Sequence, residues 1–200
     1  MIPVGHLFGK IKVRRVMLTE VIDSIHRGRP QPGAMEVPID LQYATTSTEQ
    51  TASTVTNSVA PNAENLGQAI DVLKKANKRV ILAGGGAKGC DKALIALAER
   101  LNAPVVMTIN ARGLMHGHPL GVPASPTLGA IRDLISEADL ILALGTELGP
   151  TDYDHYGDHR MPTLAQMIRV DICPDQLAGH EAAVTICSPL EMVLPDLVAA

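Results

Sequence analysis

Beyond Pro61 the apolar residues follow two alternating spacings along the chain. Between residues 63 and 76 they recur three or four positions apart, as on one face of a helix. Short continuous apolar runs separate such segments, which is typical of strands buried on both faces of a parallel sheet. The pattern predicts strands at Arg79–Ala83, Pro104–Thr108, Asp139–Leu144, Met167–Val170 and Ala182–Ile186, and helices at Ala63–Ala76, Lys88–Leu101, Thr127–Ser136 (with Thr127 as its cap) and Leu190–Val198. Strands that alternate with helices in this way indicate an α/β domain of βαβ units around a parallel sheet.

Residues 1–61 follow a different pattern. A helix is predicted within residues 13–27, and a short strand at Gly33–Pro38 ends at a proline that cannot donate to a sheet. Residues 43–61 are rich in Thr and Ser and have little apolar periodicity, as in a linker. We therefore expect a remnant of a preceding domain (1–42), a linker (43–61) and a compact domain (62–200).

Composition narrows the classes of partner. The core has to be aliphatic, because the chain has one Phe, three Tyr and no Trp. A formal net charge of -4 and few aromatic side chains disfavour nucleic acid, which requires a basic surface or stacking platforms. No segment has the roughly 20 apolar residues of a membrane helix. Cys90, Cys173 and Cys187 are odd in number and lack a CxxC pair, so we expect a cytoplasmic protein without a zinc site or disulfide framework.

The strongest local signal is a glycine turn in the segment VILAGGGAKG, residues 80–89. Gly84, Gly85 and Gly86 follow an apolar strand and precede a predicted helix, an arrangement whose backbone N–H groups can hold a pyrophosphate. A tight strand-to-helix turn with close packing explains the same glycines equally well. A second turn, Gly145–Thr146, follows another apolar strand. In doubly wound sheets such turns converge at the carboxyl edge of the strands, where ligands bind.

Other polar residues have two interpretations each. Asp171 follows the strand MIRV and can bind a ribose; the sequence favours the alternative, in which it caps a helix or forms an Asx turn before Pro174. The HGH loop, with His116 and His118, and the segment DYDHYGDH (152–159) contain metal-ligand residue types. Neither has a recognised metal spacing, so a solvated loop is favoured. Cys90 is either a thiol whose pKa a helix N-terminus lowers or a small packed hydrophobic residue.

Several motifs occur in the order found in one enzyme family. RGRP, PG and EVPIDL, within residues 27–41, resemble the GRPGPVxxxIPxDV ending of the pyrimidine-binding domain of thiamine-diphosphate enzymes. The family includes acetolactate synthase and 2-oxo acid decarboxylases. The glycine turn after RVILA, then LAERLNAPVVMT, ARGLMHGHPLGVP, EADLILALGTEL and IRVDICPDQL follow in the order of its central domain. The resemblance covers nearly all of the chain.

This resemblance implies a Rossmann-like, six-stranded parallel sheet with helices on both faces, of the DHS-like NAD/FAD-binding type. In the family the central domain sometimes binds FAD or ADP and often binds nothing. The family's GKG is Ala111–Arg112–Gly113 here, and the GxRxxD stretch of FAD-binding members is Gly145–Gly149 without its arginine, which disfavours FAD. Arg112 can still pair with a phosphate. The candidate nucleotide site is Gly84, Gly85, Gly86, Thr108, Arg112, Gly145, Thr146 and Asp171.

The resemblance also places the catalytic chemistry outside this chain. In the family a glutamate of the pyrimidine-binding domain activates thiamine diphosphate, and a GDG...N segment of a third domain binds magnesium and diphosphate. We therefore expect this chain to bind neither group, to contain no catalytic residue, and to partner those two domains in a homo-oligomer. The first hypothesis is the scaffold and oligomer interface of a 2-oxo acid decarboxylase or acetolactate synthase-like enzyme. The alternatives are a stand-alone FAD-, ADP- or NAD-binding module and a subunit-interaction domain.

Overall fold

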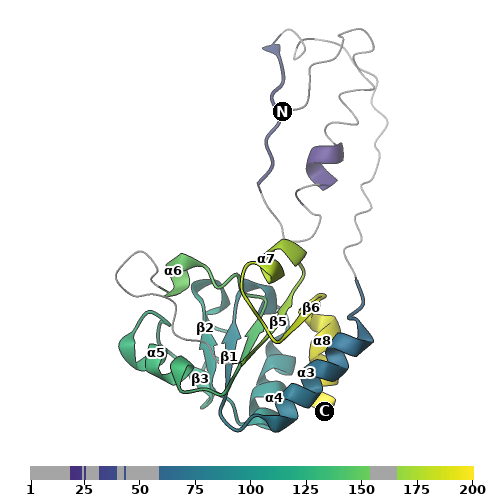
Figure 1. Ribbon diagram of the computed structural model, residues 1–200. Helices are drawn as coiled ribbons and strands as arrows, with labels where there is room; N and C mark the ends of the chain where they lie inside the picture. Colours follow the sequence, from purple (N-terminus) through teal and green to yellow (C-terminus); the bar gives the residue numbers. More distant parts are fainter. Residues whose placement is uncertain (1–18, 24, 26–31, 40–42, 44–58, 154–165) are drawn as a thin grey trace. The chain divides into compact units, whose positions relative to one another are not determined.

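The computed structural model describes residues 19–23, 25, 32–39, 43, 59–153 and 166–200 (Figure 1). The chain divides into two compact units, Met1–Asn57 and Ser58–Ala200. In the first unit residues 19–23 and 25 are helical, and the rest of the predicted helix 13–27 lies outside the described residues, as does most of the predicted linker. The predicted strand Gly33–Pro38 is wrong. A strand requires a hydrogen-bonded neighbour, and none is described beside these residues.

The second unit alternates strands with helices as the apolar pattern predicts. Its strands are β1 (Arg79–Ala83), β2 (Val105–Met107), β3 (Gly121–Val122), β4 (Leu140–Leu144), β5 (Gln166–Asp171) and β6 (Val184–Cys187). Its helices are α3 (Ala63–Lys75), α4 (Asp91–Leu101), α5 (Gly129–Ser136), α6 (Pro150–Tyr153), α7 (Pro174–Ala178) and α8 (Leu190–Ala199), with short 3₁₀ helices η1 (Gly85–Ala87) and η2 (Ile109–Ala111). All neighbouring strands are parallel. The predicted six-stranded parallel α/β sheet is confirmed.

The strand order β3-β2-β1-β4-β5-β6 places β1 and β4 side by side at the centre of the sheet. Strands β2 and β3 follow β1 toward one edge of the sheet. The chain then returns to the centre to form β4, and β5 and β6 follow toward the other edge. In doubly wound sheets ligands bind outside the carboxyl ends of the strands at this reversal. β1 and β4 are paired from Arg79↔Leu140 to Ala83↔Leu144, so the turns that follow them begin at the same level.

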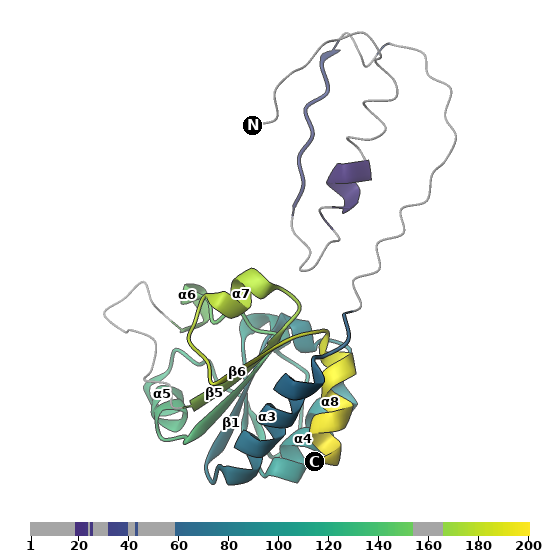
Figure 2. The same cartoon turned by 45° about the vertical axis from the view of Figure 1, so that its right-hand side comes forward.

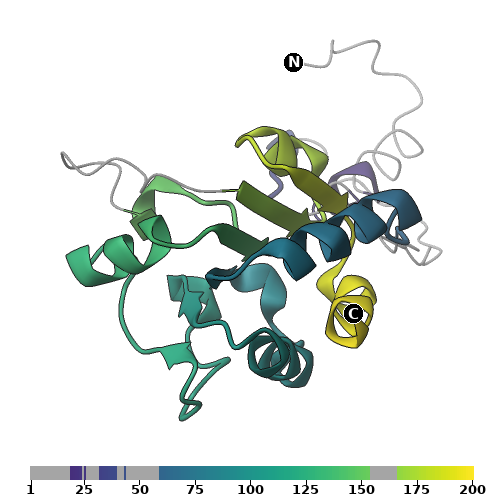
Figure 3. The same ribbon diagram turned by 60° about the horizontal axis from the view of Figure 1, so that its bottom comes forward.

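Two apolar layers cover the faces of the sheet. Helices α3, α4 and α8 lie on one face, and α5 lies on the other together with the segment that contains α6 (Figures 2 and 3). Alternate residues of β4 join opposite layers: Leu142 packs in the first and Ile141 in the second. All residues of β4 are buried, which explains why this strand is a continuous apolar run in the sequence.

Local signals account for some helix ends and not for others. The side-chain oxygen of Asn62 caps α3 by accepting the N–H groups of Glu64 (2.8 Å) and Asn65 (3.2 Å). Thr127 does not cap α5 as predicted, because its hydroxyl pairs with that of Ser125 at 2.9 Å.

No described helix is both long enough and apolar enough to cross a membrane.

A buried arginine ties together the elements beyond the carboxyl end of β5. The side chain of Arg169 is 1% exposed, and its Nη1 donates to the carbonyl oxygens of Gln176 (2.8 Å) and Leu177 (3.3 Å) in α7. Its Nη2 donates to the carbonyl oxygen of Thr146 at 3.4 Å. One guanidinium group therefore holds both α7 and the turn after β4 against the sheet.

A carboxylate at the other end of the sheet joins β4 to the turn before β1. The two oxygens of Asp139 accept the backbone N–H groups of Asn77 (2.8 Å) and Lys78 (2.9 Å). These two hydrogen bonds, and to a lesser degree the charge of Arg79, hold the pKa of Asp139 below its usual range.

Replacing Arg169 with Met is expected to lower the free energy of unfolding by about 2–4 kcal/mol, because buried carbonyl groups lose charged donors. Arg79→Met is the matched control: Arg79 is partly exposed, and its Nε donates to the carbonyl oxygen of Leu73 at 3.0 Å. It should cost about 1 kcal/mol. Urea unfolding followed by circular dichroism measures both, and equal losses would contradict the role given to Arg169.

Asp139→Asn is expected to be less stable than the wild type at neutral pH, by an amount that shrinks on acidification. Because the folded-state pKa is lowered, the stabilisation by Asp139 is present above the ordinary carboxyl pKa and is lost as the pH falls through the lowered value. Thermal melting at pH values from about 7 to about 3 tests this. Asp133→Asn, which removes an exposed carboxylate from α5, is the control. A difference that stays constant with pH would refute the prediction.

Candidate functional site

The predicted site residues follow neighbouring strands at the carboxyl edge of the sheet. Gly84–Gly86 follow β1, Thr108 follows β2, Gly145–Thr146 follows β4, and Asp171 is the last residue of β5. These strands are consecutive in the sheet, so the topology brings their turns to one edge. Arg112 lies farther along the chain, directly after η2.

The glycine turns after β1 and β4 touch each other directly. A Cβ atom on Gly84 would overlap the carbonyl oxygen of Gly145, and one on Gly86 would lie 2.8 Å from the Cα of Gly145. Gly145 itself has a φ of 58°, in the left-handed region that favours glycine. The two backbones therefore pack at a separation that side chains would prevent.

Three backbone donors at the first turn are already used within the protein. The N–H of Gly84 donates to the carbonyl oxygen of Leu144 (2.9 Å), and that of Gly86 to the carbonyl oxygen of Gly145 (3.0 Å). The N–H of Ala87 donates back to Gly84 at 3.0 Å. A pyrophosphate would need donors of this kind, so the geometry favours the close-packing interpretation of the three glycines.

The glycine turn is also separated from the start of α4. The predicted helix start at Lys88 is wrong: residues 85–87 form η1, and α4 begins at Asp91. Gly89 lies between them with a φ of 84°, which interrupts helical geometry. The positive end of the helix dipole is thus not at the turn where a phosphate was expected.

Cys90, the residue before α4, is a packed hydrophobic residue. It is 9% exposed and belongs to the apolar layer under α4. Burial raises the pKa of the Cys90 thiol, and the nearby carboxylates of Glu191 and Asp91 raise it further. The alternative interpretation, a thiol of lowered pKa, is therefore wrong.

The remaining polar candidates at the carboxyl edge of the sheet are buried, and two of them accept hydrogen bonds from backbone N–H groups of the turns. Thr108, Thr146 and Asp171 are each less than 5% exposed. A carboxylate oxygen of Asp171 accepts the N–H of Cys173 at 2.9 Å, which is the Asx turn that the sequence favours. The hydroxyl oxygen of Thr146 accepts the N–H of Leu148 at 3.3 Å.

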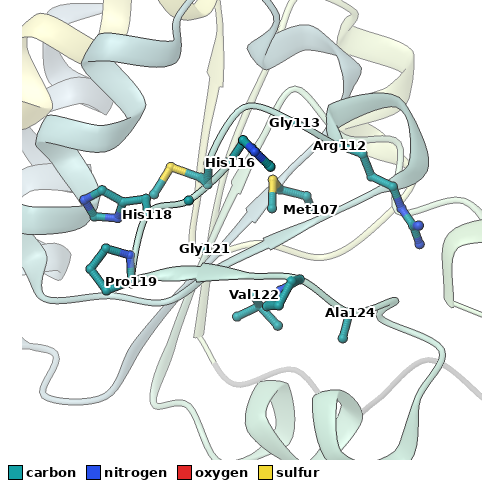
Figure 4. A pocket seen from close by; sticks show the side chains of 12 residues that line it. Met107, Arg112, Gly113, His116, His118, Pro119, Gly121, Val122 and Ala124 are labelled. Carbon is teal, nitrogen blue, oxygen red and sulfur yellow. The ribbon is translucent and has the colours of Figure 1, made fainter.

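A cavity of about 630 Å³ lies beside β2 and β3 (Figure 4). It is lined by Met107 and by most of the residues between 112 and 124, among them Arg112, His116 and His118. The side chain of Arg112 points away from the two imidazoles in Figure 4, so the three basic groups do not converge on one point. The volume is in the range of about 300–1,000 Å³ that is usual for small-molecule pockets.

Hydrogen bonds fix the ring of His118. Its Nδ1 accepts the N–H of Leu120 at 3.2 Å, and its Nε2 lies 3.2 Å from the Oε1 of Glu99 in α4. A ring nitrogen that accepts carries no proton, so Nε2 carries it and donates to the carboxylate.

The described residues contain no group of three or more His, Cys, Asp or Glu side chains arranged to hold a metal ion. Residues 154–159 of the DYDHYGDH segment lie outside the described ones.

The first two residues of that segment have structural roles that the sequence did not indicate. An oxygen of Asp152 accepts the N–H of Ile109 at 3.2 Å, which ties α6 to η2. Tyr153 is fully buried, and burial raises the pKa of its hydroxyl, with the charge of Asp152 adding to the effect. Helix α6 is a single turn and is therefore too short to produce an apolar period. The only local signal for it in the sequence is the pair Asp152–Tyr153.

Comparison with known proteins identifies the family. Residues 66–197 match the family model described as "Thiamine pyrophosphate enzyme, central domain". The chain is 36% identical over 149 residues to a Pseudomonas aeruginosa protein named "Probable 2-ketoarginine decarboxylase AruI". This alignment covers 73% of this chain and 26% of that protein. It is 30% identical over 192 residues to the acetolactate synthase isozyme 2 large subunit of Escherichia coli, covering 90% of this chain and 34% of the relative.

The fold is shared with a solved structure. The crystal structure of benzoylformate decarboxylase from Polynucleobacter necessarius aligns with a TM-score of 0.61 at 22% identity, over 81% of this chain and 31% of that one. The chain thus spans about a quarter to a third of the length of the curated relatives above. The matched region runs from Leu66 in α3 to Leu197 in α8, and so includes every strand of the sheet. This chain therefore belongs to the thiamine pyrophosphate enzyme family and contains the central domain of that family.

Proposed function

We propose that residues 62–200 are the structural, non-catalytic central domain of a larger thiamine-diphosphate-dependent enzyme that acts on a 2-oxo acid. The parent enzyme is a decarboxylase or an acetolactate synthase-like transferase. In this proposal residues 1–42 end a pyrimidine-binding domain and residues 43–61 are a linker. The observation that carries the proposal is the match of residues 66–197 to the central domain, in a chain that spans about a quarter to a third of the length of its relatives.

The packing at the carboxyl edge supports a scaffold role. At the reversal between β1 and β4, where a Rossmann-like sheet offers its ligand crevice, the glycine turns fill the space with their own backbones. Arg169 then fixes the neighbouring turn and α7. A rigid edge of this kind suits a domain that positions two others and forms part of a homo-oligomer.

The described residues do not fit a site for thiamine diphosphate and magnesium. They include no cluster of potential metal ligands, and the N–H groups of Gly84 and Gly86 at the switch point are bonded to backbone carbonyl groups. In the proposed enzyme both groups are held by the pyrimidine-binding and diphosphate-binding domains. This chain would hold those two domains in position relative to each other.

A second candidate function is the binding of a nucleotide such as FAD, ADP or NAD by this domain. The observation that favours it is the cavity of about 630 Å³ lined by Arg112, whose guanidinium group can pair with a phosphate. Such a ligand would lie over β2 and β3, away from the glycine turns. Candidate residues Thr108 and Asp171 are buried and would have little part in it.

Calorimetric titration of the full 200-residue chain separates these functions. With ADP, FAD, NAD, or thiamine diphosphate plus magnesium, the proposal predicts no saturable heat. Stoichiometric binding of a nucleotide that Arg112→Ala abolishes would replace the scaffold proposal with the nucleotide-binding one. Stoichiometric binding of thiamine diphosphate would refute the assignment of that cofactor to the other domains. Lys92→Ala, which removes an exposed charge from α4 outside the cavity lining, is the control for a general charge effect.

Gly86→Ala is expected to destabilise the chain by about 1–3 kcal/mol, because its Cβ would press on the backbone of Gly145. Gly67→Ala is the matched control: a Cβ at Gly67, within α3, would meet nothing within 4 Å. That substitution should stabilise the chain by about 0.5–1 kcal/mol. Urea unfolding measures both. Unchanged stability of Gly86→Ala would mean that the glycine is not required for packing.

A further inference from the structure

Cys173 and Cys187 lie near the carboxyl ends of the neighbouring strands β5 and β6, although α7 lies between them along the chain. Cys187 is the last residue of β6, and its Cα partner in the parallel pair is Asp171, the last residue of β5. Cys173 follows Asp171 by two positions. The sheet therefore brings two of the three cysteines to the same place.

The local turn brings Cys173 back toward Cys187. Paired residues of adjacent parallel strands point to the same face of the sheet, so the side chains of Asp171 and Cys187 share a face. The Asp171 carboxylate accepts the N–H of Cys173 at 2.9 Å, which folds the chain onto that face. The Cys187 Sγ donates to the carbonyl oxygen of Ile172 at 3.8 Å, the residue bonded to Cys173. The Cys187 sulfur thus lies within one peptide unit of Cys173.

Reagents can reach this pair of thiols. All three cysteines are free thiols, of which Cys187 is exposed, Cys173 is partly exposed and Cys90 is buried. Burial raises the pKa of Cys187, and the nearby groups Asp171 and Cys173 raise it further. Because its pKa is raised, Cys187 needs a more alkaline pH than an ordinary thiol to form the thiolate that attacks a disulfide.

We propose that Cys173 and Cys187 form a dithiol site that small-molecule disulfides oxidise to an intramolecular disulfide. One cysteine thiolate attacks the S–S bond of the reagent, forms a mixed disulfide and expels the first reagent thiolate. The other cysteine thiolate then attacks the protein sulfur of the mixed disulfide and expels the second. Two protein thiols have lost two electrons, the reagent has become two thiols, and these carry the two protons released.

This inference does not rest on the proposed enzymatic function. The new bond would close a ring that contains α7, whose carbonyl groups bind Arg169. Oxidation would therefore tether α7 to the end of β6 at the carboxyl edge of the sheet. Reduction would release it, which makes the site reversible.

The test is oxidation of the full chain with oxidised glutathione at about pH 8.5, near the ordinary thiol pKa, followed by alkylation and mass spectrometry. The count of free thiols is expected to fall from three to one, with Cys90 remaining. No Lys or Arg follows Arg169, so trypsin leaves Cys173 and Cys187 together in the peptide 170–200. That peptide should lose two hydrogen atoms, and reduction should restore them.

Single substitutions make the result specific. Cys173→Ser and Cys187→Ser should each stop at a mixed disulfide with glutathione on the remaining cysteine of the pair. Cys90→Ser should form the internal disulfide as the wild type does. Retention of three free thiols, glutathione adducts on both Cys173 and Cys187, or a disulfide-linked dimer on a non-reducing gel would each overturn the proposal.

Discussion

The contact between two glycine turns at the centre of the sheet is the constraint on which the rest of this domain depends. β1 and β4 are paired in register to their last residues, so the turns after them meet at one level. A side chain at Gly84, Gly86 or Gly145 would overlap the backbone of the opposite turn, and the two turns could not approach this closely. The glycines therefore set how closely the two halves of a doubly wound sheet approach each other.

The same contact influences what the carboxyl edge can do. Nucleotide-binding Rossmann folds leave turn donors and a helix N-terminus open toward a pyrophosphate. Here the N–H groups of Gly84 and Gly86 bind neighbouring carbonyl groups, and α4 starts only at Asp91. The buried side chains of Arg169 and Asp171 form hydrogen bonds with backbone groups of adjacent segments. The polar groups of this edge thus hold the fold together, which suits a scaffold placed between domains that carry the chemistry.

The order of motifs along the sequence already indicates the family, whereas it does not indicate the roles of individual residues. The segments from RVILA to IRVDICPDQL occur in one order because each is a strand with its following turn, and strand order is a property of the whole sheet. A single turn such as GGG permits two roles, because glycine serves both close packing and phosphate approach. Choosing between them requires the position of Gly145, which is distant in sequence.

The sequence by itself determined the α/β class, the main strands and the helices α3, α4, α5 and α8, because long apolar runs and helical spacings are local properties of a chain. It did not reveal β3, α6 or α7, which are too short to show a period. It also misplaced the start of α4, where a positive φ at Gly89 breaks the helix. Only the tertiary structure decided that the glycine turns meet, that Arg169 spans two turns, and that Cys173 lies near Cys187. Each of these contacts joins different strands or turns, and no local pattern can encode its geometry.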